Sequence, residues 1–163
     1  MSTPPAPSSD PVRRIALPDQ EATERLAAAL APLLRPGDVL ALGGDLGAGK
    51  TTLARALIRT LTAAPEEEVP SPTFTLVQSY DAPAGPVWHF DLYRLSGPEE
   101  MLELGWDEAL ATAIVLVEWP DRLGRLLPAG RLDLTLTATG PESREAALGG
   151  GAGWAARLDE LAR

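Results

Sequence analysis

The spacing of hydrophobic residues along the chain predicts several amphipathic helices. Apolar side chains recur every three to four positions, the period of a helix with one buried face, over residues 19–34, 51–61, 98–111 and 154–163. Pro36-Gly37 follows the first of these segments and ends it, and Gly105 is expected to split the third.

Runs with the character of β-strands lie between these helices. Residues 113–117 are continuously apolar, which predicts a central strand buried on both faces, whereas 131–137 alternate Leu with polar residues, as a half-exposed strand does. The remaining expected strands are an edge strand at 12–17, a short apolar strand at 38–42, and a hairpin formed by 73–80 and 87–95 around a turn at 81–86. This order of elements favours a mixed α/β sheet covered by helices.

The chain length suits one domain. The chain has 163 residues, and we place the domain at residues 12–163. Residues 1–11 hold four prolines together with Ser and Ala, so they predict a flexible tail and no export signal. Residues 149–153 are rich in Gly and predict a flexible linker before the last helix. No run approaches the roughly 18 apolar residues of a membrane span, so we expect a cytoplasmic protein without membrane association.

Composition and charge exclude several kinds of chemistry. The chain has no Cys, which excludes disulfides, thiolate zinc sites and a cysteine nucleophile. Its 23 acidic and 14 basic residues give a formal charge of -9, which disfavours direct binding to a phosphate backbone. Thirteen of the basic residues are Arg, and Lys50 is the single Lys, so its presence calls for a local reason.

That reason is a phosphate-binding motif between the strand at 38–42 and the helix at 51–61. The sequence GxxxxGK[ST] is satisfied by Gly44-Asp45-Leu46-Gly47-Ala48-Gly49-Lys50-Thr51. Glycines let backbone amides curl around phosphate groups, and the N-terminus of the following helix adds its own amides and dipole. Lys50 provides a mobile positive charge, Thr51 provides a hydroxyl for Mg²⁺, and Thr52 is expected to contact an α-phosphate.

Two other interpretations of this segment fit less well. A Gly-rich turn that merely caps a helix does not explain a lone Lys followed by two Thr. A dinucleotide fingerprint fails because Thr52 stands where its last Gly would fall. Guanine recognition by an Asn-Lys-x-Asp motif is excluded because the chain has no Asn and no second Lys, so we expect ATP.

Acidic residues near the ends of two expected strands are candidates for metal binding and catalysis. Glu118 ends the apolar run 114–117, where a phosphate loop needs a carboxylate to hold Mg²⁺. Asp91 is the second candidate, and strand alternation places it on one face with His89 and Tyr93. His89 alone is more typical of a structural role. Trp119 follows Glu118, and its position fits a core residue, a nucleotide neighbour or a partner contact equally.

The segment 70–74 follows the helix of the phosphate loop, where switch-like loops approach a γ-phosphate. Ser71 or Thr73 could therefore touch nucleotide or metal. A plain turn around Pro70 and Pro72 that leads into a strand fits the sequence nearly as well.

Four segments, GDLGAGKTT, VPSPTFTLV, HFDLYRL and LVEWPDRL, resemble the TsaE family, also called YjeE, in their order and spacing from about residue 16 to 136. The resemblance implies a compact, P-loop NTPase-like, three-layer fold with a mixed, largely parallel central sheet flanked by helices. It also implies an ATPase that works with TsaB and TsaD to make threonylcarbamoyladenosine beside the anticodon of tRNAs reading codons that start with A.

Site roles follow from the same resemblance. Lys50 and Thr51 would bind phosphate and Mg²⁺, Glu118 would serve the metal, Asp91 would be needed for hydrolysis, and Trp119 would lie near the site. Residues 70–75 resemble the family's switch-like loop. The Pro-rich start and the Gly-rich stretch before the last helix depart from the family pattern.

We therefore expect an ATPase that reaches tRNA through protein partners, because a charge of -9 suits tRNA poorly. A small-molecule kinase is an alternative, in which Arg122 and Arg125 would lie in a lid over the acceptor. A nucleotide-sensing binding module without turnover is a third.

Overall fold

The computed structural model describes residues 13–72, 74–151 and 153–162. The first half contains β1 (Arg13–Leu17), α1 (Gln20–Leu30), the 3₁₀ helix η1 (Ala31–Leu33), β2 (Val39–Gly43), α2 (Lys50–Leu61), β3 (Val77–Ala82) and β4 (Gly85–Asp91). The second half contains α3 (Glu100–Glu103), α4 (Trp106–Thr112), β5 (Ile114–Glu118), η2 (Pro120–Leu126), β6 (Leu132–Ala138), β7 (Arg144–Gly150), α5 (Trp154–Leu158) and η3 (Asp159–Ala162). The predicted tail at 1–11 lies outside the described residues.

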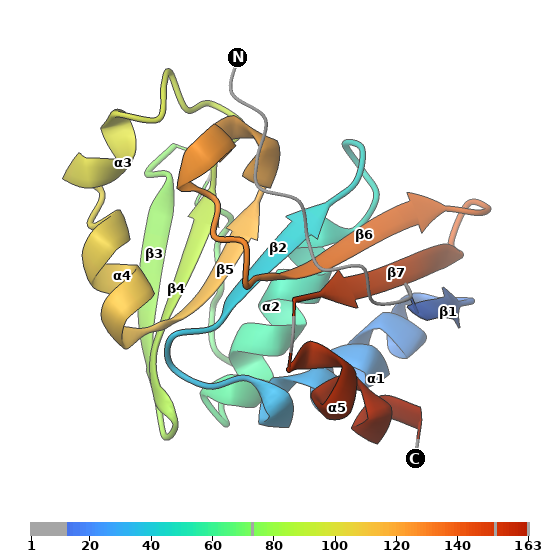
Figure 1. The fold of residues 1–163 in the computed structure, drawn as a ribbon. Helices are drawn as coiled ribbons and strands as arrows, with labels where there is room; N and C mark the ends of the chain where they lie inside the picture. The colour runs from blue at the N-terminus through green and yellow to red at the C-terminus, as the bar shows by residue number, and fades with distance from the viewer. Residues whose placement is uncertain (1–12, 73, 152, 163) are drawn as a thin grey trace.

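All seven described strands form one sheet in the order β1-β7-β6-β2-β5-β4-β3 (Figure 1). Its centre is parallel, since β2 pairs in parallel with both β5 and β6, and β5 pairs in parallel with β4. Antiparallel strands extend both sides: β7 and β1 beyond β6, and β3 beyond β4. This confirms a mixed sheet that is parallel in its centre, with residues 13–17 as an edge strand.

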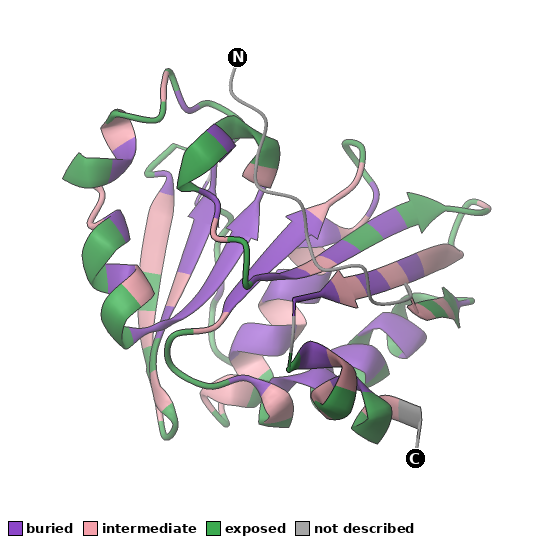
Figure 2. Ribbon diagram, viewed as in Figure 1, coloured by how far each residue is buried: buried purple, intermediate pink, exposed green. Residues whose placement is uncertain are grey.

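Helices cover both faces of the sheet, which confirms the three-layer arrangement. Helices α1, α2 and α5 lie on one face, and α3 and α4 lie on the other (Figure 1). Strand β5 shows why its sequence is continuously apolar. Its side chains alternate between the two faces, with Leu116 packed in the cluster under α1 and α2 and Val117 in the cluster under α4. The central strands are accordingly the most buried part of the molecule (Figure 2).

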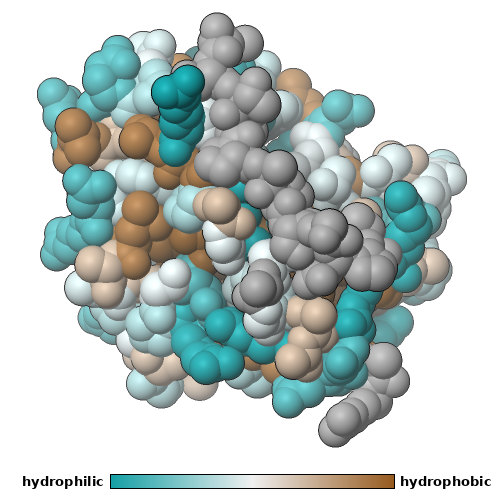
Figure 3. Space-filling view, in the orientation of Figure 1, coloured by the Kyte–Doolittle hydropathy of each residue, from teal (hydrophilic) through white to brown (hydrophobic). Residues whose placement is uncertain are grey.

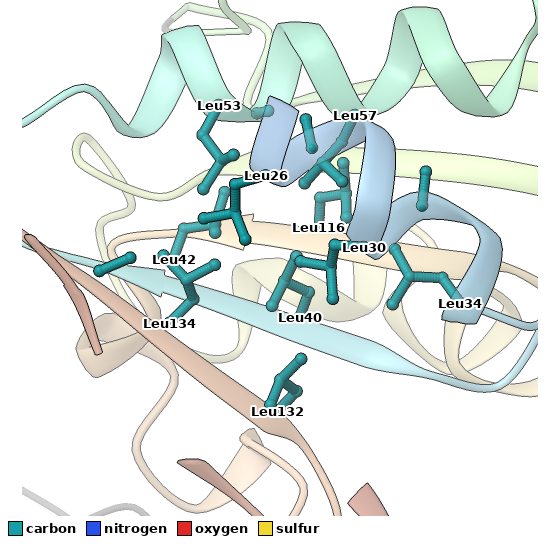
Figure 4. Packing of buried hydrophobic residues seen from close by; sticks show 14 of the residues in the cluster. Leu26, Leu30, Leu34, Leu40, Leu42, Leu53, Leu57, Leu116, Leu132 and Leu134 are labelled. Atoms are coloured by element: carbon teal, nitrogen blue, oxygen red, sulfur yellow. The ribbon is translucent and has the colours of Figure 1, made fainter. Parts of the chain in front are cut away.

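Leucine dominates the packing on the α1 and α2 face. Side chains from these two helices interdigitate with those of β2, β5 and β6 (Figure 4). The labelled members of this layer are Leu26, Leu30, Leu34, Leu40, Leu42, Leu53, Leu57, Leu116, Leu132 and Leu134. Burying each leucine contributes about 2 kcal/mol, so this layer holds α2, and with it the phosphate loop, firmly against the sheet.

Local signals fix several element boundaries. The side chain of Asp19 accepts a hydrogen bond from the Ala22 amide at 2.9 Å and caps α1. Gly105 has a φ of 85° and separates α3 from α4, as its position in the sequence predicts. Strand β6 alternates buried Leu with exposed Thr, which confirms a half-exposed strand.

The hairpin is confirmed, but its bounds differ from the prediction. Strands β3 and β4 pair up to Ala82 and Gly85, so the turn is shorter than the expected 81–86, and β4 ends at Asp91 and not at residue 95 as expected. The expected strand at 73–80 is wrong at its start, where Leu76 has a φ of 69° and donates its amide to the carbonyl of Pro72 at 2.8 Å. Leu76, with its left-handed backbone conformation, closes a turn at this point, and the strand begins only at Val77.

The Gly-rich segment before α5 is the main difference from the expected architecture. Gly149 and Gly150 are paired residues of β7, not part of a linker. At Gly150 a Cβ atom would lie 2.7 Å from Cγ of Trp154, so only glycine lets the indole pack on this strand. The absence of bulky β-branched residues from 144–150 hides the strand from a sequence-based prediction.

The surface view combines hydrophilic side chains with a few hydrophobic ones, which gather toward α3 and α4 (Figure 3). Leu102 of α3 is one of the exposed apolar residues. Among the described residues, every helix is too short or too polar to cross a lipid bilayer.

Candidate functional site

The phosphate-binding motif forms the loop between β2 and α2, at the carboxyl end of the central parallel strands. Two of its glycines are required by geometry. At Gly44, with a φ of 132°, a Cβ atom would lie 2.5 Å from the carbonyl oxygen of Leu136. Gly49 has a φ of 104° and directly precedes the first turn of α2. The loop therefore lies close to β6 and leads the first amides of α2 into the site.

Lys50 lies folded against this loop. Its side chain is only 5% exposed. The ammonium donates hydrogen bonds to the carbonyl oxygens of Gly44 and of Asp45, the latter at 3.0 Å. Burial lowers the pKa of the Lys50 ammonium below its usual value, and the carboxylate of Glu118 is the strongest influence in the opposite direction. An added anionic group next to Lys50 would favour its charged form further.

Glu118 links the phosphate loop to the neighbouring strands. The sheet register aligns Leu42 with Glu118, and Glu118 with Asp91, so the ends of β2, β5 and β4 lie side by side. The hydroxyl of Thr51 donates to Oε1 of Glu118 at 2.9 Å. Sequence analysis predicted these two residues as metal ligands, and the structure brings them together.

His89 contacts the second oxygen of the same carboxylate. Its Nε2 lies 2.7 Å from Oε2 of Glu118, and both side chains are buried. An ionised carboxylate only accepts hydrogen bonds, so this contact requires the His89 proton on Nε2 when Glu118 is charged. Nδ1 has no hydrogen-bond partner among the described residues. The sequence favoured a structural role for His89, whereas the geometry shows that it fixes the orientation of a site carboxylate.

Asp91 lies at the end of β4, at the other side of Glu118. Its Oδ2 accepts a hydrogen bond from the Ser71 hydroxyl at 3.3 Å, and its Oδ1 accepts one from the Tyr93 amide at 3.1 Å. The segment that resembles a switch loop therefore contacts Asp91 through Ser71. Thr73, the other candidate from this segment, lies outside the described residues.

Trp119 covers the site from the end of β5. Its φ of 59° turns the chain sharply after Glu118. This turn places the indole 3.9 Å from Nζ of Lys50, and its ring centroid is 5.0 Å from that of Tyr93. The indole therefore lies beside the phosphate loop and also packs against the hydrophobic cluster under α4, which agrees in part with a core residue; its contact with nucleotide stays a prediction.

Arg144 is a further residue at the loop, and no motif in the sequence indicated it. It begins β7, and its guanidinium donates to the carbonyl oxygens of Ala48 at 3.0 Å and Gly47 at 3.2 Å. The contact joins residues almost a hundred positions apart, so local spacing carries no signal of it.

Two adjoining cavities lie along the phosphate loop. One of about 460 Å³ contains the loop and the acidic residues, and one of about 470 Å³ extends toward the N-terminus of α1 and the β6–β7 connection. Both are lined by Gly49, Thr52 and Arg144. The first is lined in addition by Leu46, Gly47, Lys50, Thr51, Ser71, Asp91, Tyr93, Arg94, Glu118 and Trp119.

The two arginines expected in a kinase lid lie outside these cavities. Arg122 and Arg125 are exposed on η2, and neither lines the cavity around Lys50. The guanidinium of Arg122 lies over the Tyr93 ring at 5.9 Å.

The site suits a magnesium ion shared with a phosphate group better than a metal held by protein alone. The described residues contain no cluster of three or more His, Cys, Asp or Glu that could hold a metal. Thr51 and Glu118 offer two hard oxygen ligands beside the phosphate loop. Mg²⁺ is commonly bound by one or two protein oxygens, with phosphate and water completing the octahedron, and this donor set fits it.

Comparison with known proteins agrees with the geometry. A family model described as "Threonylcarbamoyl adenosine biosynthesis protein TsaE" matches residues 17–146. The tRNA threonylcarbamoyladenosine biosynthesis protein TsaE of Rickettsia conorii is 42% identical over 122 residues, which cover 75% of this chain and 69% of the relative. The protein of the same name from Bacillus subtilis is 38% identical over 126 residues, 77% of each chain.

A solved structure extends this similarity to the fold. The crystal structure of YdiB from Bacillus subtilis superposes with a TM-score of 0.77 at 31% identity, and the match covers 95% of this chain and 98% of that one. The family match spans most of the chain, and the relatives are similar over the same region. The chain therefore belongs to the TsaE family.

Proposed function

We propose that this chain is a Mg²⁺-dependent ATPase that acts in the cytoplasm with TsaB and TsaD in the formation of threonylcarbamoyladenosine in tRNA. The pathway is supported by membership of the TsaE family, whose named members are threonylcarbamoyladenosine biosynthesis proteins. The ATPase activity is supported by the site. The observation that supports this activity most strongly is the hydrogen bond from Thr51 to Glu118, which joins the phosphate loop to a buried carboxylate.

Binding of the triphosphate would fall to the loop and the start of α2. The backbone amides of the first turn of α2 have no partners within the helix, and they face a loop that is rich in glycine. Lys50 would move its ammonium from the carbonyls of Gly44 and Asp45 toward the phosphates. Thr51 and Glu118 would hold Mg²⁺, which supplies charge neutralisation at the transferred phosphoryl group when bound.

Hydrolysis requires a group that orients water, and we propose Asp91 for this role. Asp91 pairs with Glu118 in the register of β4 and β5. Its side chain is buried and lines the same cavity as Lys50. The Tyr93 amide and the Ser71 hydroxyl hold its two oxygens. Asp91 would accept a hydrogen bond from the attacking water and orient it in line with the terminal phosphate.

Contact with tRNA would run through TsaB and TsaD, because this chain offers a polyanion little attraction. The net charge is -9, and the single Lys is committed to the phosphate loop. Several arginines are paired with carboxylates or backbone carbonyls, as Arg14 is with Glu145 and Arg157 with Asp38. The field of the whole chain therefore opposes tRNA.

Release of inorganic phosphate from Mg-ATP, measured with no acceptor molecule, tests the enzymatic part of the proposal. The parent protein should release phosphate, and Lys50→Ala should not. Arg59→Ala serves as the matched control, since Arg59 is a cation on the same helix α2 whose Nε donates to the Glu67 carbonyl away from the site. Phosphate transfer only to an added small molecule would indicate a kinase, and binding without turnover would indicate a nucleotide-sensing module.

A second experiment tests the partners. We expect purified TsaB and TsaD to retain this chain in the presence of ATP, and the isolated chain to bind tRNA weakly at near-physiological salt. Lys50→Ala should lose the nucleotide dependence of the association. Tight, salt-sensitive tRNA binding by the isolated chain, without association with TsaB and TsaD, would contradict the proposal.

A further inference from the structure

Arg144 ties the phosphate loop to a distant part of the sheet. It stands at the start of β7, where it pairs with Ala138 of β6 and Leu17 of β1. Its guanidinium crosses to the loop and donates through Nε to Ala48 O at 3.0 Å and through Nη2 to Gly47 O at 3.2 Å. These are two consecutive carbonyls in the middle of the phosphate-binding motif.

The guanidinium is itself held in place. Its third nitrogen, Nη1, donates to Ser143 O at 2.9 Å and Gly140 O at 3.3 Å, within the β6–β7 connection. Each of its nitrogens is therefore bound to backbone carbonyls. Among the described residues, no carboxylate lies within ion-pair distance of Arg144. Only a planar fork of donors can join two segments of backbone in this way, and a lysine could satisfy one part of the arrangement at most.

The contact determines which way the loop amides point. In a trans peptide, the carbonyl of one residue and the amide of the next face opposite sides. With the Ala48 carbonyl turned toward Arg144, the Gly49 amide faces away from Arg144. That amide has no acceptor among the described residues, and Gly49 lines the same cavity as Lys50 and Thr51. The Ala48 amide, opposite the Gly47 carbonyl, closes the loop by donating to Asp45 O at 3.0 Å.

We propose that Arg144 is a positioning residue that holds the Gly47 and Ala48 peptides of the phosphate loop in the orientation that binds an anion. The inference rests on the proposed function for its nucleotide readout, but the orientation of the loop is a property of the chain alone. Without Arg144, the two carbonyls would lose their protein donors. Nucleotide binding would then have to order the loop as well as contact it.

A competing explanation is that Arg144 acts only through its charge beside the phosphates. Three variants separate the two explanations. Arg144→Ala removes both fork and charge, and Arg144→Lys keeps the charge but loses the fork. Arg14→Ala is the matched control, because Arg14 lies on β1 opposite Ala147 of β7 and its guanidinium binds Glu145 at the surface.

The first measurement is amide hydrogen exchange of the nucleotide-free proteins. We expect Arg144→Ala and Arg144→Lys to exchange faster over residues 44–53, while the buried strand β5 keeps the protection of the parent. Arg14→Ala should match the parent throughout. An equal loss of protection in β5 would show a general loss of stability and would overturn the positioning role.

The second measurement is the affinity for Mg-ATP together with the steady-state constants. Loss of two hydrogen bonds that order the loop should raise Kd and KM about tenfold in both Arg144 variants, with kcat changed less than about twofold. A Lys variant that binds as tightly as the parent would overturn the proposal in favour of charge alone. If the parent binds Mg-ATP but has no turnover, the proposed function fails, while the exchange and affinity results still decide the role of Arg144.

Discussion

The two sides of the cavity are built in different ways. The phosphate side is one continuous stretch of sequence, Gly44–Thr52, in which loop glycines and a helix N-terminus act locally. The acidic side is assembled from β4 and β5, and its members Asp91 and Glu118 become neighbours only through the parallel register. The two sides meet in the hydrogen bond from Thr51 to Glu118.

Under the proposed function, this difference separates two tasks. Backbone amides and the Lys50 ammonium suit the binding of a phosphate chain, which carries its negative charge already in the bound state. Buried carboxylates suit the placement of metal and water, which matters most in the transition state. We therefore expect changes on the acidic side to slow turnover with binding largely kept, and changes on the phosphate side to weaken binding, with Lys50 also affecting turnover because its charge acts on the phosphates in both states.

The largest effect is expected for Lys50→Ala. The variant loses the charge of the only lysine, which acts on the phosphates both in bound ATP and in the transition state. ATP affinity and kcat should each fall about a hundredfold, so kcat/KM should fall roughly ten-thousandfold. The fold should persist, since its side chain contacts loop carbonyls and not the leucine core. Isothermal titration with Mg-ATP measures the binding part. Binding as tight as in the parent would show that this loop is not the phosphate site.

Glu118→Gln should lower kcat about a thousandfold while changing ATP affinity far less. The amide keeps the shape of the side chain but provides a weaker ligand for Mg²⁺ and a weaker acceptor for His89. Titration of Mg²⁺ at saturating ATP should show a raised requirement for the metal. Asp121→Asn is the matched control, because Asp121 is an exposed carboxylate three residues later and should leave the titration unchanged.

Asp91→Asn should lower kcat about a hundredfold, the lower range for loss of a group that orients or deprotonates water. Its Mg²⁺ titration should follow that of the parent, because Asp91 binds Ser71 and Tyr93 and not Thr51. Identical metal profiles for the Asp91 and Glu118 variants would contradict the division of tasks within the acidic side.

The smallest effect is expected for Trp119→Phe. A phenyl ring retains part of the interaction with Lys50, so Mg-ATP affinity should fall only about threefold. The nucleotide-induced change in tryptophan fluorescence should disappear in this variant. Trp88→Phe is the control, since Trp88 packs on Phe90 and does not line the cavity around Lys50, which Trp119 does. A fluorescence change that survives in Trp119→Phe would place the indole away from bound nucleotide.

The contrast between the two sides also explains what could be predicted from sequence. The phosphate loop, Glu118 and the central strand could be predicted because each depends on a short pattern: a motif, a strand end and an apolar run. The hairpin and the split at Gly105 are likewise local. The contacts of the phosphate loop and of Glu118 with nucleotide and metal stay predictions, which the experiments above test.

What escaped prediction depends on distant partners. Strand β7 has little strand propensity of its own, and it is stabilised by β1 and β6 on its two sides. Arg144 contacts the loop through backbone carbonyls. Every residue has such a carbonyl, so the types of the partner residues give no signal of the contact. His89 gained its role only when the register placed it opposite Leu116, two positions before the strand end at Glu118 and on the same face.

The pairing of β2 has a consequence for how the chain acquires its site during synthesis. The phosphate motif is complete once Thr51 has been made, but the strands on both sides of β2 begin only at Ile114 and Leu132. Arg144, which holds two carbonyls of the loop, is made later still. Chains grow at about 5–20 residues per second, so the motif waits several seconds for the strands that support it. A nascent chain stalled before β5 would therefore display an intact motif and bind no nucleotide.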